Sequence, residues 1–289
     1  MSGADNYGLR PLWIEMLAIF DEFVKICERH GLRYYAYAGT ALGAVRHKGF
    51  IPWDDDMDLA MPRPDYEAFA AIANEELPSC FRFVNWKNTG EFSLLFGKIQ
   101  LADRDKVERI ERNMGKTLSN GIFIDIFPLD GYPSKWWTFY IKTRDFGLSL
   151  LERYHLTSFA KLTFRGKIAW CAGAVVSIFV PWIRRRKQFL SIHENSLLKF
   201  RFGETKMIGD VGYFHDVFRH PCYKRDVWGQ PVPHEFEDRS IMLPTDVDAH
   251  LKAHFGNYME LPPESARHPS HQLSYHHSWW LGPTIVDKI

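Results

Sequence analysis

Four aspartates, Asp54, Asp55, Asp56 and Asp58, occur within five positions, directly before a short apolar segment. Like charges this close repel one another, so a fold rarely places them beside apolar side chains unless a cation offsets them. Asp56 and Asp58 are two residues apart, and in an extended segment both carboxylates point to the same face. Such oxygens suit Mg²⁺ or Mn²⁺. The cluster therefore indicates a divalent-metal site, and the alternative is a solvated acidic turn that caps the following element.

Gly39 and Thr40 stand where a buried strand expected at residues 32–38 gives way to a helix. Backbone amides at a helix start, together with a hydroxyl, can bind phosphate oxygens. Arg46, His47 and Lys48 lie between this turn and the aspartates, and their basic side chains could meet the phosphates of a donor. For these three residues, exposed surface positions are the alternative.

A further carboxylate, Asp125, interrupts an apolar strand expected at residues 122–127. A charged side chain is costly there unless it is paired or metal-bound, so Asp125 is a candidate third metal ligand or general base. The alternative is a carboxylate satisfied by backbone amides or by a basic partner. Asp130, at the turn after this strand, is expected to be a cap.

The pattern along the first half of the chain predicts an α/β (α+β) fold, with a mixed sheet flanked by helices. Apolar residues recur at three- and four-residue intervals in two amphipathic helices, at residues 12–27 and 66–77. Gly31 is expected to end the first helix, and Pro62 and Pro64 are expected to mark a loop. Strands are predicted at residues 32–38, 57–61, 92–101 and 122–127.

The chain divides into three expected parts: a catalytic core at residues 1–133, a helical insertion at 134–202, and a C-terminal part at 203–289 that completes the active site. Within the insertion, residues 168–183 are almost free of charge and are followed by a basic run at residues 184–187. This apolar run is shorter than a typical membrane span. It is consistent with a buried helix, or with a segment at a membrane surface whose basic run meets anionic lipid.

Charge and cysteine spacing exclude several classes of protein. The 36 Lys and Arg residues nearly balance the 35 Asp and Glu residues, so no global positive field indicates nucleic acid as a partner. The cysteines lack the close pairing of a zinc or thiol redox site and are expected to be reduced core thiols; they are Cys27, Cys80, Cys171 and Cys222. The N-terminus has no secretory signal pattern, so a cytoplasmic location is expected.

Histidines are frequent in residues 244–277. Their spacing, without a nearby cysteine, favours a partly exposed polar lid over a zinc site. Arg267 and His271 in this segment could contact the diphosphate of a donor or assist proton transfer to it.

The stretch from Gly39-Thr40 through Arg46-His-Lys-Gly-Phe-Ile-Pro-Trp-Asp-Asp-Asp-Met-Asp58 resembles the LicD family, bacterial phosphotransferases related to fukutin. The likeness continues through Gly121-Ile-Phe-Ile-Asp-Ile-Phe-Pro-Leu-Asp130 and Gly256-Asn-Tyr-Met-Glu-Leu-Pro-Pro263. It implies a nucleotidyltransferase-like fold in which Gly39 and Thr40 form the phosphate turn and Asp56, Asp58 and Asp125 hold the metal. The connection from Thr40 to Asp56 is longer than in many members of that superfamily.

The same resemblance implies transfer of phosphocholine from CDP-choline to teichoic acid, lipopolysaccharide or another surface glycan. A choline head group is stabilised by aromatic ring faces, for which the candidates are Trp53, Trp86, Trp136, Trp137, Tyr258, Trp279 and Trp280.

The resulting hypothesis is metal-dependent transfer of a substituted phosphate from a nucleotide-activated donor to a glycan. The enzyme would be cytoplasmic or peripheral on the inner face of the plasma membrane. The alternatives are transfer of a glycerol, ribitol or sugar phosphate, transfer of the nucleotide itself, and a non-catalytic glycan-binding or assembly module.

Overall fold

The computed structural model describes residues 7–89, 95–101, 107–110, 122–132, 159, 164–179, 186–210, 222–269 and 272–275. Its helices are α1 (Arg10–His30), α2 (Ala38–His47), α3 (Arg63–Glu76), α5 (Phe164–Phe179), α6 (Arg186–Leu197) and α7 (Val247–Phe255), with short 3₁₀ helices η4 (Arg225–Trp228) and η5 (Glu264–Ala266). Its strands are β1 (Tyr35–Ala36), β2 (Asp58–Pro62), β3 (Phe81–Val84), β4 (Gly97–Leu101), β5 (Val107–Ile110), β6 (Phe123–Tyr132), β7 (Met207–Asp210), β8 (Tyr223–Lys224), β9 (Val232–Phe236), β10 (Arg239–Leu243) and β11 (Gln272–Tyr275).

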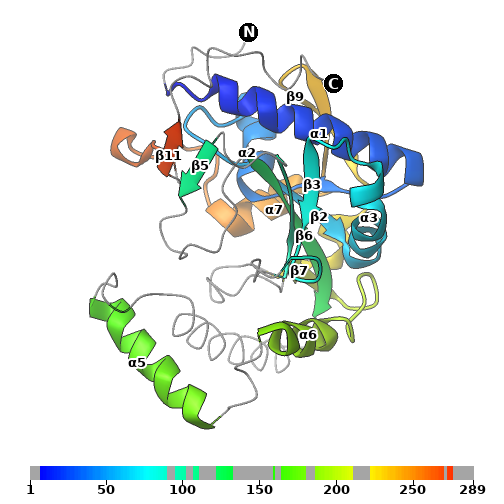
Figure 1. The fold of residues 1–289 in the computed structure, drawn as a ribbon. Coiled ribbons are helices and arrows are strands. Elements are labelled where there is room, and N and C mark those ends of the chain that lie inside the picture. Colours follow the sequence, from blue (N-terminus) through cyan, green and yellow to red (C-terminus); the bar gives the residue numbers. More distant parts are fainter. Residues whose placement is uncertain are drawn as a thin grey trace.

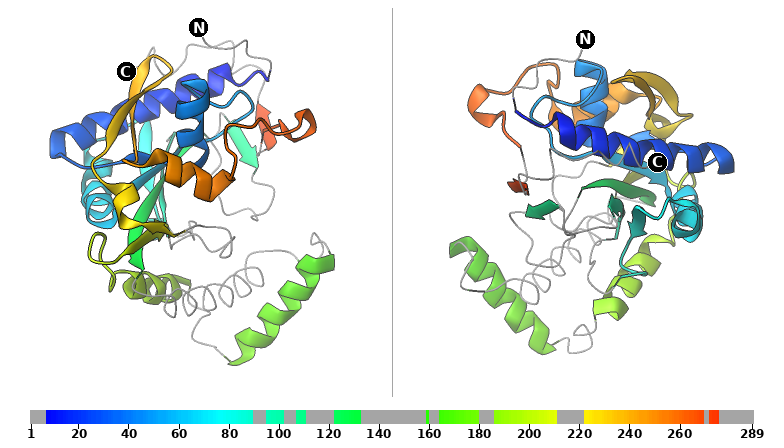
Figure 2. Two further views of the ribbon diagram at one scale, coloured as in Figure 1. Left: turned by 180° about the vertical axis from the view of Figure 1, so that it is seen from behind. Right: turned by 45° about the horizontal axis from the view of Figure 1, so that its top comes forward.

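The main sheet is mixed and is built around β6, whose ten residues are all buried (Figure 1). Its order is β1-β2-β6-β4-β3, with β7 also on β6 and β8 on β7. Of these pairs, β2 and β6 run parallel, whereas the others are antiparallel. Helices flank the sheet, with α1 across one side and α2 packed against α7 on another (Figures 1 and 2). The expected mixed sheet with flanking helices is therefore confirmed.

The alternation of side chains along β2 and β6 decides which residues face the core. Leu59, Met61, Ile124 and Ile126 pack in the larger hydrophobic cluster with the inner face of α1. The positions between them, Ala60, Phe127 and Leu129, pack in a second cluster with Tyr37, Tyr223 and Trp228. By the same period of two, Asp58 and Asp125 lie on the face of the second cluster.

Several element boundaries differ from the sequence predictions. The strand expected at residues 32–38 is only Tyr35–Ala36, because the chain turns into α2 directly after Tyr37. Pro64 does not mark a loop but lies in the first turn of α3, where a proline needs no amide partner. Gly31 ends α1 in the left-handed conformation, as expected.

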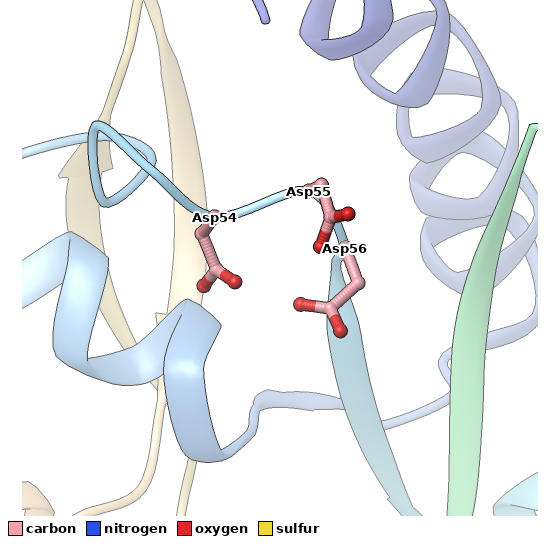
Figure 3. Close-up of side chains that lie close together, drawn as sticks. All are labelled: Asp54, Asp55 and Asp56. Atoms are coloured by element: carbon pink, nitrogen blue, oxygen red, sulfur yellow. The ribbon is translucent and has the colours of Figure 1, made fainter. Parts of the chain in front are cut away.

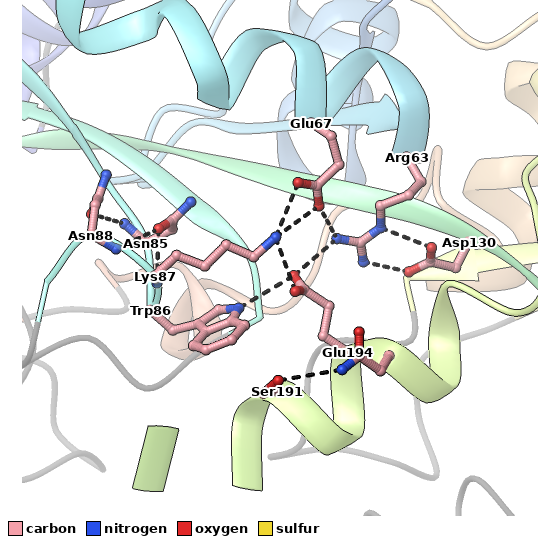
Figure 4. A network of polar contacts seen from close by, with 10 residues as sticks. Arg63, Glu67, Asn85, Trp86, Lys87, Asn88, Asp130, Ser191 and Glu194 are labelled. Atoms are coloured by element: carbon pink, nitrogen blue, oxygen red, sulfur yellow. Dashed lines mark hydrogen bonds and ion pairs between the residues drawn. The ribbon is translucent and has the colours of Figure 1, made fainter. Parts of the chain in front are cut away.

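Asp130 is not a cap but a buried member of β6, and it forms an ion pair with Arg63 at the start of α3 (Figure 4). Arg63 Nε and Nη2 lie 2.8 and 2.5 Å from the two Asp130 oxygens. Glu194 of α6 lies 3.6 Å from Arg63 and 2.9 Å from Lys87, and Lys87 also pairs with Glu67. This Arg63 network, made of Arg63, Glu67, Lys87, Asp130 and Glu194, ties α6 to the sheet.

Much of the apolar insertion segment lies in α5, whose outer side chains are exposed, so the alternative of a buried helix does not hold for its described part. No helix in the described ranges is long and apolar enough to cross a membrane. All four cysteines are free, but only Cys27 lies in the core and Cys171 on α5 is exposed, which corrects the expectation of four core thiols. The bounds of the three expected domains stay predictions.

Candidate functional site

Three charged residues form one row across the central strands. Parallel pairing places Asp58 of β2 opposite Asp125 of β6, and antiparallel pairing places Lys98 of β4 opposite Asp125 on the other side. Lys98 Nζ lies 2.7 Å from Asp125 Oδ1, and both side chains are buried. A basic partner therefore meets Asp125, which was one of the alternatives for this residue. Sequence reasoning missed Lys98, and a lysine within the apolar strand before Ile99 was the available signal.

Thr40 of α2 forms a hydrogen bond with the start of β2. Its hydroxyl oxygen accepts a hydrogen bond from the Asp58 amide at 2.8 Å, and the Tyr37 amide donates to the Asp58 carbonyl at 3.0 Å. Thr40 is almost fully buried. In this structure it positions Asp58, which adds a structural role to the phosphate-binding role expected for it.

Gly39 lets the first turn of α2 approach the aspartates closely. A Cβ atom at this position would lie 2.9 Å from Asp54 Oδ2, too close for ordinary packing. The start of a helix carries a positive partial charge, which favours a nearby carboxylate. Glycine therefore lets α2 lie close to Asp54, whose carboxylate would have to shift if a larger residue stood there.

The aspartate cluster is defined as Asp54, Asp55, Asp56 and Asp58. Its first three members lie in the segment that enters β2 (Figure 3), and Asp58 is the first residue of that strand. Asp54, Asp55 and Asp56 each offer an oxygen within 4.8 Å of the others, and Asp55 is fully buried. Burial raises the pKa of Asp54 well above its ordinary value, and the negative charges of Asp56, Asp58 and Asp55 raise it further. A bound cation would relieve this repulsion.

The donor set fits Mg²⁺ or Mn²⁺, because it consists of carboxylate oxygens that repel one another without a cation. The sequence predicted Asp56, Asp58 and Asp125 as ligands. The structure brings Asp56 into a close group with Asp54 and Asp55, and brings Asp58 beside Asp125 through the strand register. Asp54 and Asp55 are thus additional candidates, which the search for same-face carboxylates had left aside.

A pocket of about 470 Å³ is lined by parts of α2, by Ile51 and Trp53, and by residues of the segment 255–263. Trp53 directly precedes the aspartate cluster in the sequence. Arg46 donates from Nε to His47 Nε2 and from Nη1 to the Tyr258 carbonyl, at 2.9 and 2.8 Å. Arg267 lies over the Trp53 ring, 5.6 Å from its centroid, and donates to the Pro262 carbonyl. The two guanidinium groups thus use neutral acceptors in this region.

Like charges meet at the edge of this pocket, where Arg46 is a lining residue and Arg267 lies over the lining residue Trp53. Burial and then the charge of Arg267 lower the pKa of Arg46. Burial and then Arg46 lower the pKa of His47 to about 4, so His47 is neutral near pH 7. Opposite charge would relieve the repulsion between the two arginines, so the edge of the pocket at Trp53 suits an anionic group such as a phosphate, although Glu260 also lines the pocket.

Lys48 is not brought into this group. It follows the last residue of α2, at the end opposite Gly39, and its ammonium pairs with exposed Glu235 at 3.0 Å. His271, Trp136, Trp137, Trp279 and Trp280 lie outside the described residues.

His250 of α7 was not singled out from the sequence, yet it supports the site. Its Nε2 accepts a hydrogen bond from the Ala38 amide at 3.2 Å, and Ala38 has a positive φ of 41°. His250 is fully buried, so the expectation of an exposed lid is wrong for it. Burial, and then His254, lower its pKa well below the ordinary value. Neutral His250 therefore holds the first turn of α2.

The chain is similar to proteins of a known family. Residues 31–171 match the family described as LicD/FKTN/FKRP, nucleotidyltransferase domain. The lipopolysaccharide cholinephosphotransferase LicD of Haemophilus influenzae is 27% identical over 275 residues, covering 91% of this chain and 96% of that protein. Uncharacterised proteins of Rickettsia typhi and Rickettsia prowazekii are 40% and 42% identical, over only 17% and 14% of this chain and 16% and 15% of their own. The resemblance to the LicD family is confirmed.

Proposed function

Because the chain contains a LicD-family domain, we propose that it transfers phosphocholine from CDP-choline to a cell-surface glycan with the help of Mg²⁺ or Mn²⁺. The observation that carries the proposal is that the negatively charged aspartate cluster adjoins a region with two arginines, Arg46 and Arg267. The aspartate cluster follows Trp53 directly in the chain, and Trp53 lines the pocket together with Arg46 and lies under the Arg267 guanidinium. A divalent cation and basic side chains such as arginine together suit a nucleotide diphosphate donor. The cytoplasmic location expected from the sequence is part of the proposal.

Each group has a role in this reaction. Arg46 and Arg267 bind the diphosphate, and the first turn of α2 at Gly39 and Thr40 positions the aspartates. When bound at the aspartates, a divalent cation would neutralise charge on the transferred phosphate. The acceptor hydroxyl attacks the choline-bearing phosphorus, the bond to the CMP oxygen breaks, and Asp125 receives the hydroxyl proton.

The direct test measures CMP release and transfer of labelled choline from CDP-choline to cell-envelope glycan, with and without Mg²⁺ or Mn²⁺. Wild type is expected to turn over only with the cation, and Asp58→Asn is expected to lose the reaction. Asp226→Asn, on η4 with a highly exposed side chain, is the matched control and should retain it. Full activity of Asp58→Asn would contradict the mechanism.

The donor is tested in parallel with CDP-glycerol, CDP-ribitol and sugar-linked nucleotides. Release of CMP from one of these donors, but not from CDP-choline, would replace the head group and keep the metal site. Incorporation of nucleotide label into the acceptor would indicate nucleotidyl transfer instead. Binding of cation without any product across the panel would favour the non-catalytic glycan-binding module.

The pocket is tested by one substitution. Arg267→Gln removes a guanidinium from the Trp53 ring and is expected to raise the donor KM about tenfold or more, with a smaller change in kcat. Trp53 fluorescence also offers a binding readout for CMP. An unchanged KM in Arg267→Gln would remove this pocket from the proposal.

A further inference from the structure

The helix α5 carries bulky apolar side chains on its outer face. Phe164, Ile168, Val175 and Ile178 expose 79, 57, 56 and 68% of their surfaces, and Cys171 between them is also exposed. These positions are spaced by four, three, four and three residues, so they line one face of the helix. Among the positions of α5 whose burial the structure describes, the buried ones are the glycines Gly166 and Gly173. The arrangement is the reverse of an ordinary surface helix.

An aromatic pair lies beside this helix. Phe159 is 43% exposed, and its ring centroid lies 5.0 Å from that of Trp170. Lys167 Nζ lies 5.4 Å from the Phe159 ring centroid. Aromatic side chains beside basic ones are favoured where apolar and aqueous phases meet.

The charge around α5 is of one sign. The 24 residues 164–187 contain six basic residues, Arg165, Lys167, Arg184, Arg185, Arg186 and Lys187, and no acidic residue. The whole chain, by contrast, has nearly equal numbers of basic and acidic residues. A second copy of the chain docked face to face would bring these like charges together, whereas an anionic surface would complement them.

The length and position of α5 suit contact with a surface rather than insertion across it. Its 16 residues span about 24 Å, short of the hydrocarbon thickness of about 30 Å. The helix lies at the periphery of the molecule, away from the sheet and from α2, in each view (Figures 1 and 2). Lipid could therefore cover its outer face without covering the aspartate cluster.

We propose that α5 is a membrane-surface docking element that inserts its exposed apolar face into the interface of an anionic lipid bilayer, with the basic side chains of Arg165 and Lys167 at the headgroups. This inference does not depend on the proposed phosphotransfer. Lipid binding places the protein where membrane-bound acceptors are concentrated, and it takes place without donor or cation.

The test is flotation of the full chain with vesicles of phosphatidylcholine containing about one quarter phosphatidylglycerol, compared with phosphatidylcholine alone. Wild type is expected to bind the anionic vesicles, with binding that weakens as salt is raised. The double variant Val175→Glu/Ile178→Glu is expected to lower the partition coefficient about tenfold or more. Val232→Glu on β9, whose side chain is 45% exposed, is the matched control and should bind as wild type does.

A second double variant tests the contribution of charge to lipid binding separately from that of apolar burial. It also keeps the proposal testable if the first variant does not fold. Arg165→Gln/Lys167→Gln is expected to weaken binding to anionic vesicles about fivefold or more, and to leave binding to neutral vesicles unchanged. Failure of wild type to float with anionic vesicles would overturn the proposal. So would wild-type binding by both double variants, or a dimer that both variants dissociate in the absence of lipid.

Discussion

The two ends of β2 carry charged groups of opposite character. Before the strand, the aspartate cluster gathers like charges, and the pKa of Asp54 is raised by burial and by its acidic neighbours. After the strand, Arg63 is also buried, but it forms an ion pair with Asp130 (Figure 4). Burial alone would lower the pKa of Arg63, and the Asp130 carboxylate instead raises it above the ordinary value.

The difference separates a structural group of charges from a functional one. The Arg63 network contains charges of both signs, which form ion pairs with one another and connect β6, α3 and α6. Its charges therefore stabilise the fold. The aspartate cluster has an excess of one sign at a helix start, and a cation from solution would balance it. Removing a charge from the aspartate cluster should therefore leave the stability of the fold unchanged or raise it. Removing a charge from the Arg63 network should lower that stability.

The largest expected effect is on catalysis. Asp56→Asn is expected to lower phosphotransfer about a thousandfold, because the cation that stabilises the transferring phosphate loses a ligand. In metal-free buffer the melting temperature should stay equal or rise, since one like charge beside Asp54 is removed. Activity assays and thermal unfolding are measured on the same preparation. A marked loss of stability without metal would break the comparison.

The reverse is expected at the other end of the strand. Asp130→Asn leaves buried Arg63 without its full counter-charge and should cost about 3–5 kcal/mol of unfolding free energy. Urea unfolding measures this cost. The specific activity of the protein that stays folded should be close to that of wild type. Glu67→Gln, a partly exposed member of the same network, is the control and should cost much less. A cost below about 1 kcal/mol for Asp130→Asn would contradict the structural role.

A third effect tests whether the C-terminal part supports the aspartate end of β2. His250→Leu removes the acceptor of the Ala38 amide and should cost about 1–3 kcal/mol, with a matching loss of turnover. His250→Asn can retain the acceptor and should recover part of both.

His250 also makes stability depend on pH. Its folded-state pKa is lowered by burial and by His254, so the neutral ring contributes stability above the ordinary pKa of about 6.5. That contribution is lost as the pH falls below this value. Urea unfolding between about pH 7.5 and 5 should show wild type losing stability relative to His250→Asn. The exposed His234→Asn is the control, and parallel pH profiles for wild type and His250→Asn would contradict the assignment.

The smallest expected effect concerns an ion pair that belongs neither to the aspartate cluster nor to the Arg63 network. Lys48 pairs with Glu235 at the far end of α2, and both side chains are exposed. Lys48→Gln should leave the urea midpoint unchanged and turnover within about twofold of wild type, because solvent screens such pairs. A large rise in donor KM would return Lys48 to the donor site expected from the sequence.

Much of the site was available from the sequence, because its strongest signals are local. Asp54 to Asp58 adjoin in the chain, and their mutual repulsion follows from spacing alone. The strand around Asp125 and the helix start at Gly39 and Thr40 were likewise visible as local patterns. Their exact ends were not, since β1 stops at Ala36 only because Tyr37 turns into α2.

Tertiary structure alone decided the partners. The sequence determined that Asp125 is a charge in an apolar strand, but only the order β2-β6-β4 and its register place Lys98 and Asp58 on either side of it. The Ala38 and His250 contact joins residues 212 positions apart, and Arg267 reaches Trp53 across a similar distance in the chain. The periodicity of one segment reports which face is apolar, whereas strand order and docking decide what that face meets.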